Sequence, residues 1–122
     1  MPETVTVTAD RDVFARAEVV LLAVPMQALG GFVEANAALF GGKWLVACCK
    51  GVDLSTLTGP LAVIRATCPT STPAILTGPS FAADIARGLP TALTLEFRSA
   101  QCLTAMCSIA SSTTALWSDM LR

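Results

Sequence analysis

Residues 18–49 read EVVLLAVPMQALGGFVEANAALFGGKWLVACC, and this stretch decides the fold class of the 122-residue chain. Glu18–Val24 is almost continuously apolar, which is typical of a parallel strand buried on both faces. Pro25 ends that strand and suits the first position of a helix. Trp44–Cys49 repeats the apolar pattern, so the stretch predicts a strand, a helix and a second strand in parallel.

The segment between these two strands has the spacing of an amphipathic helix. Apolar residues recur at intervals of three and four from Met26 to Phe40, while Glu34 and Asn36 fall on the flanks of the apolar stripe. Gly41-Gly42 ends the segment, as glycine commonly does after a helix. The pattern therefore predicts one continuous helix from Met26 to Phe40.

The same alternation continues on either side of this stretch. We expect further strands at Thr4–Thr8, Ala74–Thr77, Thr91–Phe97 and Thr114–Trp117, and helices at Asp10–Arg16, Pro60–Ala66, Phe81–Arg87 and Ala100–Ala110. No repeat or linker divides the chain, and its length suits one domain. The fold class predicted is α/β, an open, mostly parallel sheet with helices on both faces.

Composition excludes several classes of function. The chain has no histidine and no tyrosine, so histidine-based triads, histidine metal sites and a tyrosine acid are excluded, and we expect no metal. Eight basic against nine acidic residues give a net charge of −1 without a charged run, which argues against nucleic acid as a partner. Five cysteines without a C-x-x-C pair indicate a reducing compartment, the cytoplasm.

Membrane and secretion signals are also missing from the sequence. The longest apolar run, Val19–Met26, is far shorter than the about 18–20 residues of a membrane span. The first ten residues, MPETVTVTAD, have neither the basic region nor the apolar core of a secretory signal. We therefore expect no membrane span.

In a parallel α/β sheet, ligands bind at the carboxyl ends of the strands. The segments to search are thus Ala23–Met26, Cys49–Asp53 and Thr77–Ala82. Lys50 directly follows a predicted strand, where its ammonium can pair with a phosphate or stabilise negative charge on a reacting oxygen; the alternative is a solvated loop lysine. Lys43, just ahead of that strand, is a much weaker candidate.

Gly78-Pro79-Ser80 connects a predicted strand to a predicted helix. Gly78 lets a ligand approach the backbone, and Ser80 is a natural helix cap beside free N–H groups that suit an anion. The alternative is a cap without a ligand. Together with Lys50 on a neighbouring strand end, this turn could hold a phosphate monoester. No G-x-G occurs in the sequence, so the usual dinucleotide fingerprint is not among these residues.

Three strings resemble the bacterial NAD(P)-dependent glycerol-3-phosphate dehydrogenases. They are LLAVPMQAL (Leu21–Leu29), CCKGVD (Cys48–Asp53) and TGPSFAADIARGLPTAL (Thr77–Leu93), of which the last is the most specific. The resemblance runs from about Thr4 to Arg122, and it makes the predicted sheet Rossmann-like.

The resemblance implies an enzyme that interconverts sn-glycerol 3-phosphate and dihydroxyacetone phosphate by hydride transfer with NAD or NADP, for glycerophospholipid synthesis. It implies that Lys50 contacts both substrate and cofactor, that Gly78 and Ser80 bind substrate, and that Ala82 binds cofactor. Val24 and Pro25 correspond to the strand end that lines the dinucleotide cleft.

The resemblance also has departures. The family's glycine-rich loop does not appear ahead of Thr4, and its catalytic lysine is expected beyond Arg122, so no catalytic residue is assigned. We therefore expect residues 1–122 to form a partial NAD(P)-binding domain, incomplete at its N-terminal end, with little turnover alone. Two alternatives stay open: a non-catalytic fragment that binds nucleotide or self-associates as a homo-oligomer, and a dehydrogenase of the same superfamily with another hydroxy-acid substrate.

Overall fold

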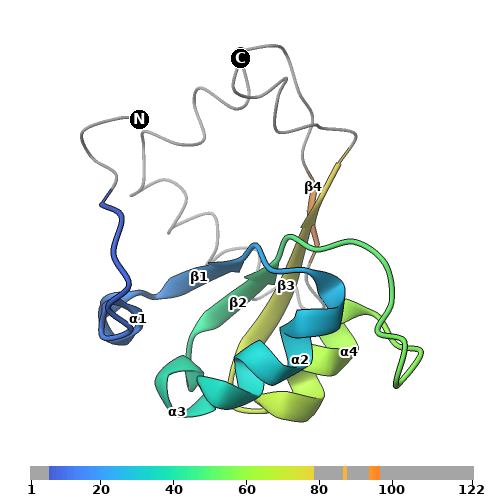
Figure 1. Ribbon diagram of the computed structural model, residues 1–122, viewed down its shortest axis with the longest axis horizontal. Coiled ribbons are helices and arrows are strands. Elements are labelled where there is room, and N and C mark those ends of the chain that lie inside the picture. Colours follow the sequence, from blue (N-terminus) through green and yellow to red (C-terminus); the bar gives the residue numbers. More distant parts are fainter. Residues whose placement is uncertain (1–5, 79–86, 88–93, 97–122) are drawn as a thin grey trace.

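The computed structural model describes residues 6–78, residue 87 and residues 94–96 (Figure 1). Within them lie four helices, α1 (Val13–Arg16), α2 (Met26–Ala35), α3 (Ala37–Phe40) and α4 (Pro60–Thr67), and four strands, β1 (Val19–Leu22), β2 (Trp44–Ala47), β3 (Thr72–Thr77) and β4 (Thr94–Glu96). The predicted elements Phe81–Arg87, Ala100–Ala110 and Thr114–Trp117 fall outside the described residues, apart from Arg87, which lies in a turn.

The described strands form one sheet in the order β1-β2-β3-β4. β1 pairs with β2 and β2 with β3 in parallel, whereas β4 runs antiparallel to β3. Two of the three pairings are parallel, which confirms the predicted open, mostly parallel sheet.

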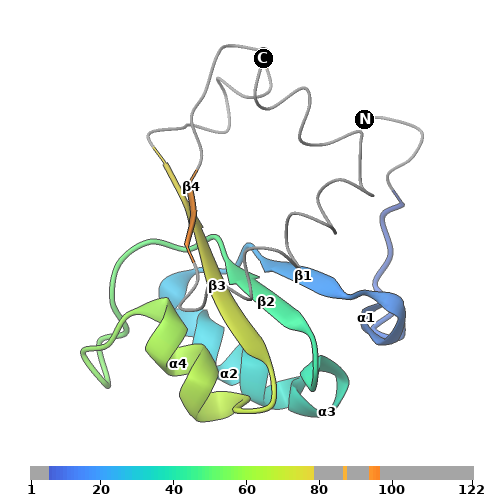
Figure 2. The same ribbon diagram turned by 180° about the vertical axis from the view of Figure 1, so that it is seen from behind.

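Helices α2 and α4 lie side by side on the same face of the sheet (Figures 1 and 2). Each belongs to a crossover between neighbouring parallel strands, and the strand order advances in one direction. Since such crossovers share one hand, both helices must fall on one face. The core lies between this face and the helices; its fully buried side chains include Leu22, Leu29, Val33, Phe40, Leu45 and Ile64.

Strand β1 is covered on one face only in the described part of the chain. Val20 and Leu22 are buried, but Leu21, which points to the other face, is 61% exposed. The prediction that this strand is buried on both faces is wrong here, because α2 covers only the side on which Val20 and Leu22 lie.

The predicted helix Met26–Phe40 is in fact two helices. The break falls at Asn36, whose φ of −118° and ψ of 9° depart from helical values. Its side chain is 4% exposed rather than on a polar flank: Nδ2 donates to the Phe32 carbonyl at 2.7 Å, and Oδ1 accepts from Arg11 Nε at 3.0 Å.

The first elements of the chain and the start of α2 also differ from the prediction. Residues 6–8 of the predicted strand Thr4–Thr8 are not in a strand, and Val7 is 78% exposed; Thr4 and Val5 lie outside the described residues. The predicted helix Asp10–Arg16 is reduced to α1, because the Asp10 carboxylate accepts the Asp12 N–H and holds a turn ahead of it. Pro25 occupies the cap of α2 and not its first helical position.

Among the described residues, every helix is too short or too polar to cross a bilayer.

Candidate functional site

The ends of three parallel strands bring the predicted segments to one edge of the sheet. The register pairs Leu22 of β1 with Ala47 of β2, and Ala47 with Ile75 of β3. The residues that follow each strand therefore emerge at the same edge, as they must in a parallel sheet. This edge is the candidate site.

Lys50 and Gly78 meet at this edge. The Lys50 side chain is exposed, and its Nζ donates a hydrogen bond of 3.3 Å to the Gly78 carbonyl oxygen. The contact joins residues from two neighbouring strand ends that are 28 positions apart in the chain. Gly51, which follows Lys50, has a φ of +100°, a conformation that side chains other than glycine strain to adopt, and so the chain turns away from the sheet here.

Two further predicted residues lie at the end of β1. Val24 is half-buried and packs against the core, whereas Pro25 is exposed at the start of α2. Ser80 and Ala82 fall outside the described residues.

Gln27 was not among the predicted site residues, yet its side chain joins α2 to the segment after Lys50. Its Nε2 donates to the Val52 carbonyl at 2.8 Å, and its Oε1 accepts the Leu54 N–H at 3.0 Å. Both ends of the amide are thus used by one short piece of backbone. The sequence signal was available: a glutamine two residues after the proline that closes an apolar strand.

Asp53 builds the turn that follows. Its Oδ2 accepts hydrogen bonds from the Ser55 hydroxyl and from the N–H and hydroxyl of Thr56, the latter two at 2.8 Å. These bonds, that of Ser55 first, lower the pKa of the Asp53 carboxyl below its ordinary value of 3.8. The carboxylate is therefore engaged in holding the loop, not in proton transfer.

The neighbouring cysteines Cys48 and Cys49 follow β2; Cys48 is half-buried and Cys49 is buried. Burial raises the pKa of both thiols, and the neighbouring Cys49 raises that of Cys48 further. Cys49 is buried, with its Sγ 3.7 Å from the Met26 Sδ. Both thiols stay protonated near neutral pH, so they are poor nucleophiles.

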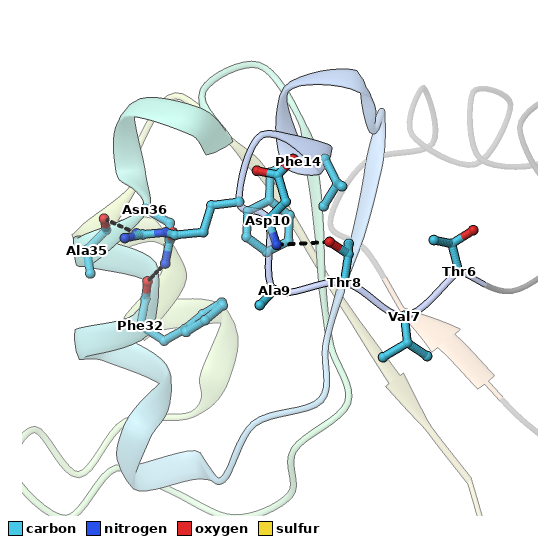
Figure 3. Close-up of a pocket in the computed structure, with 11 residues that line it drawn as sticks. Thr6, Val7, Thr8, Ala9, Asp10, Phe14, Phe32, Ala35 and Asn36 are labelled. Atoms are coloured by element: carbon cyan, nitrogen blue, oxygen red, sulfur yellow. Dashed lines mark hydrogen bonds between the residues drawn. The ribbon is translucent and has the colours of Figure 1, made fainter.

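A cavity of about 690 Å³ lies elsewhere, between residues 6–11 and the carboxyl-terminal end of α2 (Figure 3). Val7, Phe14 and Phe32 give it a largely apolar lining. Because α2 begins at the edge that carries Lys50 and runs away from it, this cavity is at the opposite end of the helix. None of the predicted site residues in the described part of the chain lines it.

Residues 1–103 match the family described as the N-terminus of NAD-dependent glycerol-3-phosphate dehydrogenase. Glycerol-3-phosphate dehydrogenase [NAD(P)+] of Cereibacter sphaeroides is 66% identical over 95 residues, which are 78% of this chain and 31% of that protein. The enzyme of the same name from Paracoccus denitrificans is 61% identical over 95 residues, 78% of this chain and 30% of its own length.

Among solved structures, the crystal structure of glycerol-3-phosphate dehydrogenase from Coxiella burnetii superposes with a TM-score of 0.75 at 22% identity. The match covers 86% of this chain and 33% of that one, and at this identity it shows the fold alone. It confirms the predicted Rossmann-like class. This chain spans about a third of the length of the curated relatives it matches. Because the match to the family covers residues 1–103 of 122, the chain belongs to the family of the N-terminal domain of NAD-dependent glycerol-3-phosphate dehydrogenase.

Proposed function

We propose that this chain forms the part of an NAD(P)-dependent sn-glycerol-3-phosphate dehydrogenase that contacts both substrate and cofactor. The reaction interconverts glycerol 3-phosphate and dihydroxyacetone phosphate, and its product serves glycerophospholipid synthesis. The observation that carries the proposal is the Lys50–Gly78 contact across two strand ends, together with membership of the family.

The geometry suits a small phosphorylated substrate. The Lys50 ammonium is exposed and held by one carbonyl oxygen, which leaves its other two protons for a ligand oxygen. A cation fixed there can bind a phosphate or stabilise negative charge on the substrate oxygen during hydride transfer. Gly78 has no side chain of its own, so a ligand can approach its backbone, and we assign Gly78 and Ser80 to the substrate.

The same edge fits a dinucleotide. Pro25 and the end of β1 offer an apolar surface beside the Lys50 cation, so a flat ring and a charged group can be bound side by side. We assign Val24, Pro25, Lys50 and Ala82 to NAD or NADP. When bound, the cofactor supplies the hydride chemistry, while these residues orient it.

The test is to titrate glycerol 3-phosphate and NADH into the wild-type chain and into Lys50→Met by calorimetry. The matched control is Lys43→Met, which removes the same charge at the opposite end of β2, where Lys43 Nζ donates to the Ala15 and Ala17 carbonyls. We expect Lys50→Met to weaken binding by about 10-fold or more, since hydrogen bonds to charged groups contribute about 1.5–3 kcal/mol. Equal affinities for the two variants would contradict the assignment of Lys50.

The 122 residues contain no G-x-G, and we expect them to bind ligand with little turnover on their own. An assay of dihydroxyacetone phosphate reduction with NADH and with NADPH checks this expectation. Robust activity would contradict it.

The second candidate function is a non-catalytic module that self-associates. Among residues 6–78 and 94–96, β1 pairs with β2 alone, so its other side is a lateral edge of the sheet. Leu21 of this strand is 61% exposed. An unpaired strand edge is a template for a second chain. Sedimentation showing a homo-oligomer without affinity for glycerol 3-phosphate or NADH would favour this candidate.

We assign the protein to the cytoplasm. The cysteines in the described part of the chain, Cys48, Cys49 and Cys68, are free thiols, which fits a reducing compartment.

A further inference from the structure

We propose that Gln27 is a positioning residue that holds Lys50 in place at the strand ends. The inference rests on the proposed role of Lys50 in binding. The two hydrogen bonds of the Gln27 side chain go to Val52 and Leu54, so Gln27 acts through the backbone that follows Lys50.

The contact is specific at both ends of the amide. Nε2 donates to the Val52 carbonyl and Oε1 accepts the Leu54 N–H, at 2.8 and 3.0 Å. A carboxylate would lack the donor, and an aliphatic side chain would lack both groups. The two bonds tie residues 52–54 to the first turn of α2, 25 and 27 positions away in the chain.

The contact with Gln27 matters because the backbone next to Lys50 has to be fixed by a residue outside the loop. Only Gly51 separates Lys50 from Val52, and glycine restricts the backbone less than any other residue. On the far side, Asp53 organises its own turn through Ser55 and Thr56, and the N–H of Leu54 in this turn is bound to α2 by Gln27. Gln27 is therefore the side chain that transfers the rigidity of α2 to the segment bearing Lys50.

The surroundings favour a polar anchor over an apolar one. Val52 and Leu54 are 49% and 72% exposed, so this loop gains little hold from burying its own side chains. Without the amide, the Val52 carbonyl and the Leu54 N–H would turn to water, and the ammonium of Lys50 would spend more time away from the Gly78 oxygen.

The experiment compares the wild-type chain with Gln27→Met, Gln27→Glu and the control Glu34→Gln, an exposed residue of the same helix. Amide exchange of Leu54 reports the anchor. The rate at which trinitrobenzenesulfonate modifies Lys50, read by mass spectrometry, reports the placement of the ammonium. Lys43, the other lysine of the chain, is an internal standard in the same molecule.

In Gln27→Met we expect faster exchange at Leu54 and about 2- to 10-fold faster modification of Lys50, as the loss of one or two net hydrogen bonds predicts. Modification of Lys43 should not change, whereas general unfolding would accelerate both lysines. Gln27→Glu retains the acceptor for Leu54 and loses the donor to Val52, so Leu54 should stay protected while Lys50 reacts faster. Glu34→Gln should match the wild type in both measurements.

Two results would overturn the inference. If Leu54 exchanges faster in Gln27→Met while Lys50 reacts at the wild-type rate, Gln27 anchors the loop without positioning Lys50. If Leu54 exchange is unchanged, the contact does not hold the loop at all. The affinity of the wild-type chain for glycerol 3-phosphate is a separate measurement. If the chain does not bind glycerol 3-phosphate, the proposed function is contradicted, while the modification rates of Lys50 and Lys43 still test the role of Gln27.

Discussion

Asp53 shows how a single side chain can fix a functional loop. One carboxylate oxygen accepts three hydrogen bonds from Ser55 and Thr56, and these bonds lower the pKa of the carboxyl. The folded state therefore holds the proton less tightly than the unfolded chain does. The stabilisation that the Asp53 carboxylate gives the fold is complete above the ordinary pKa of 3.8. It is lost as the pH falls through the lowered pKa of the folded state.

We predict that Asp53→Asn lowers the free energy of unfolding near pH 7 by a small amount, because the group is at the surface. The difference from the wild type should shrink as the pH falls below 3.8 and through the lowered pKa of Asp53, because the carboxyl is neutral below it. Urea titrations across this range measure it. Ser55→Ala, which removes the strongest donor, should also reduce the pH dependence; a constant gap at every pH would contradict the assignment.

Asn36 is the residue whose environment the sequence pattern misjudged. The spacing of apolar residues put it on a flank, but the structure buries it with Arg11 and the Phe32 carbonyl satisfying its amide. Arg11 also donates to the Ala35 carbonyl at 2.9 Å, so a cation sits at the carboxyl-terminal end of α2. That partner is 25 residues away in the chain, and no local pattern reveals it.

Helix α2 and the turn after α3 use glycine in opposite ways. Gly31 lies inside α2, and a Cβ added there would meet no atom within 4 Å. Gly42 has a φ of +73°, and its N–H donates to the Thr70 carbonyl at 3.1 Å. The first glycine weakens its helix, while the second permits its turn.

We predict that Gly31→Ala raises the free energy of unfolding by about 0.5–1 kcal/mol, since alanine is the better helix former. Gly42→Ala should lower it by about 1–2 kcal/mol, because alanine strains to adopt a positive φ. Urea unfolding of the two variants beside the wild type measures both effects. A Gly31→Ala variant less stable than the wild type, or a Gly42→Ala variant more stable, would contradict the backbone conformation described for that glycine.

In the described part of the chain, the larger of two apolar clusters forms a layer between α2, α4 and one face of the sheet. Leu29 of α2 and Ile64 of α4 are both 0% exposed in this layer. Because α2 and α4 pack on the same face of the sheet, a truncated side chain in one helix also removes packing contacts from the other. Leu54, at 72% exposed, lies outside the layer.

We predict that Leu29→Ala destabilises the fold by about 2–5 kcal/mol, the usual cost of such a truncation in a core. Leu54→Ala should change the free energy of unfolding by less than about 0.5 kcal/mol. Chemical denaturation followed by circular dichroism compares the two. A Leu29→Ala variant as stable as Leu54→Ala would mean that α2 does not pack on the sheet as described.

The sequence by itself determined the alternation of strands and helices between residues 19 and 77, the α/β class and the edge that carries Lys50. Apolar runs and helical spacing are local properties, and parallel strands must end at one edge, so Lys50 and Gly78 could be placed on neighbouring strand ends without coordinates. Only the tertiary structure decided that Asn36 breaks the long helix, that Leu21 of β1 is exposed, and that Gln27 binds the loop after Lys50. Each of these depends on a partner more than 20 residues away or on which face a helix covers, and periodicity along the chain carries no information about either.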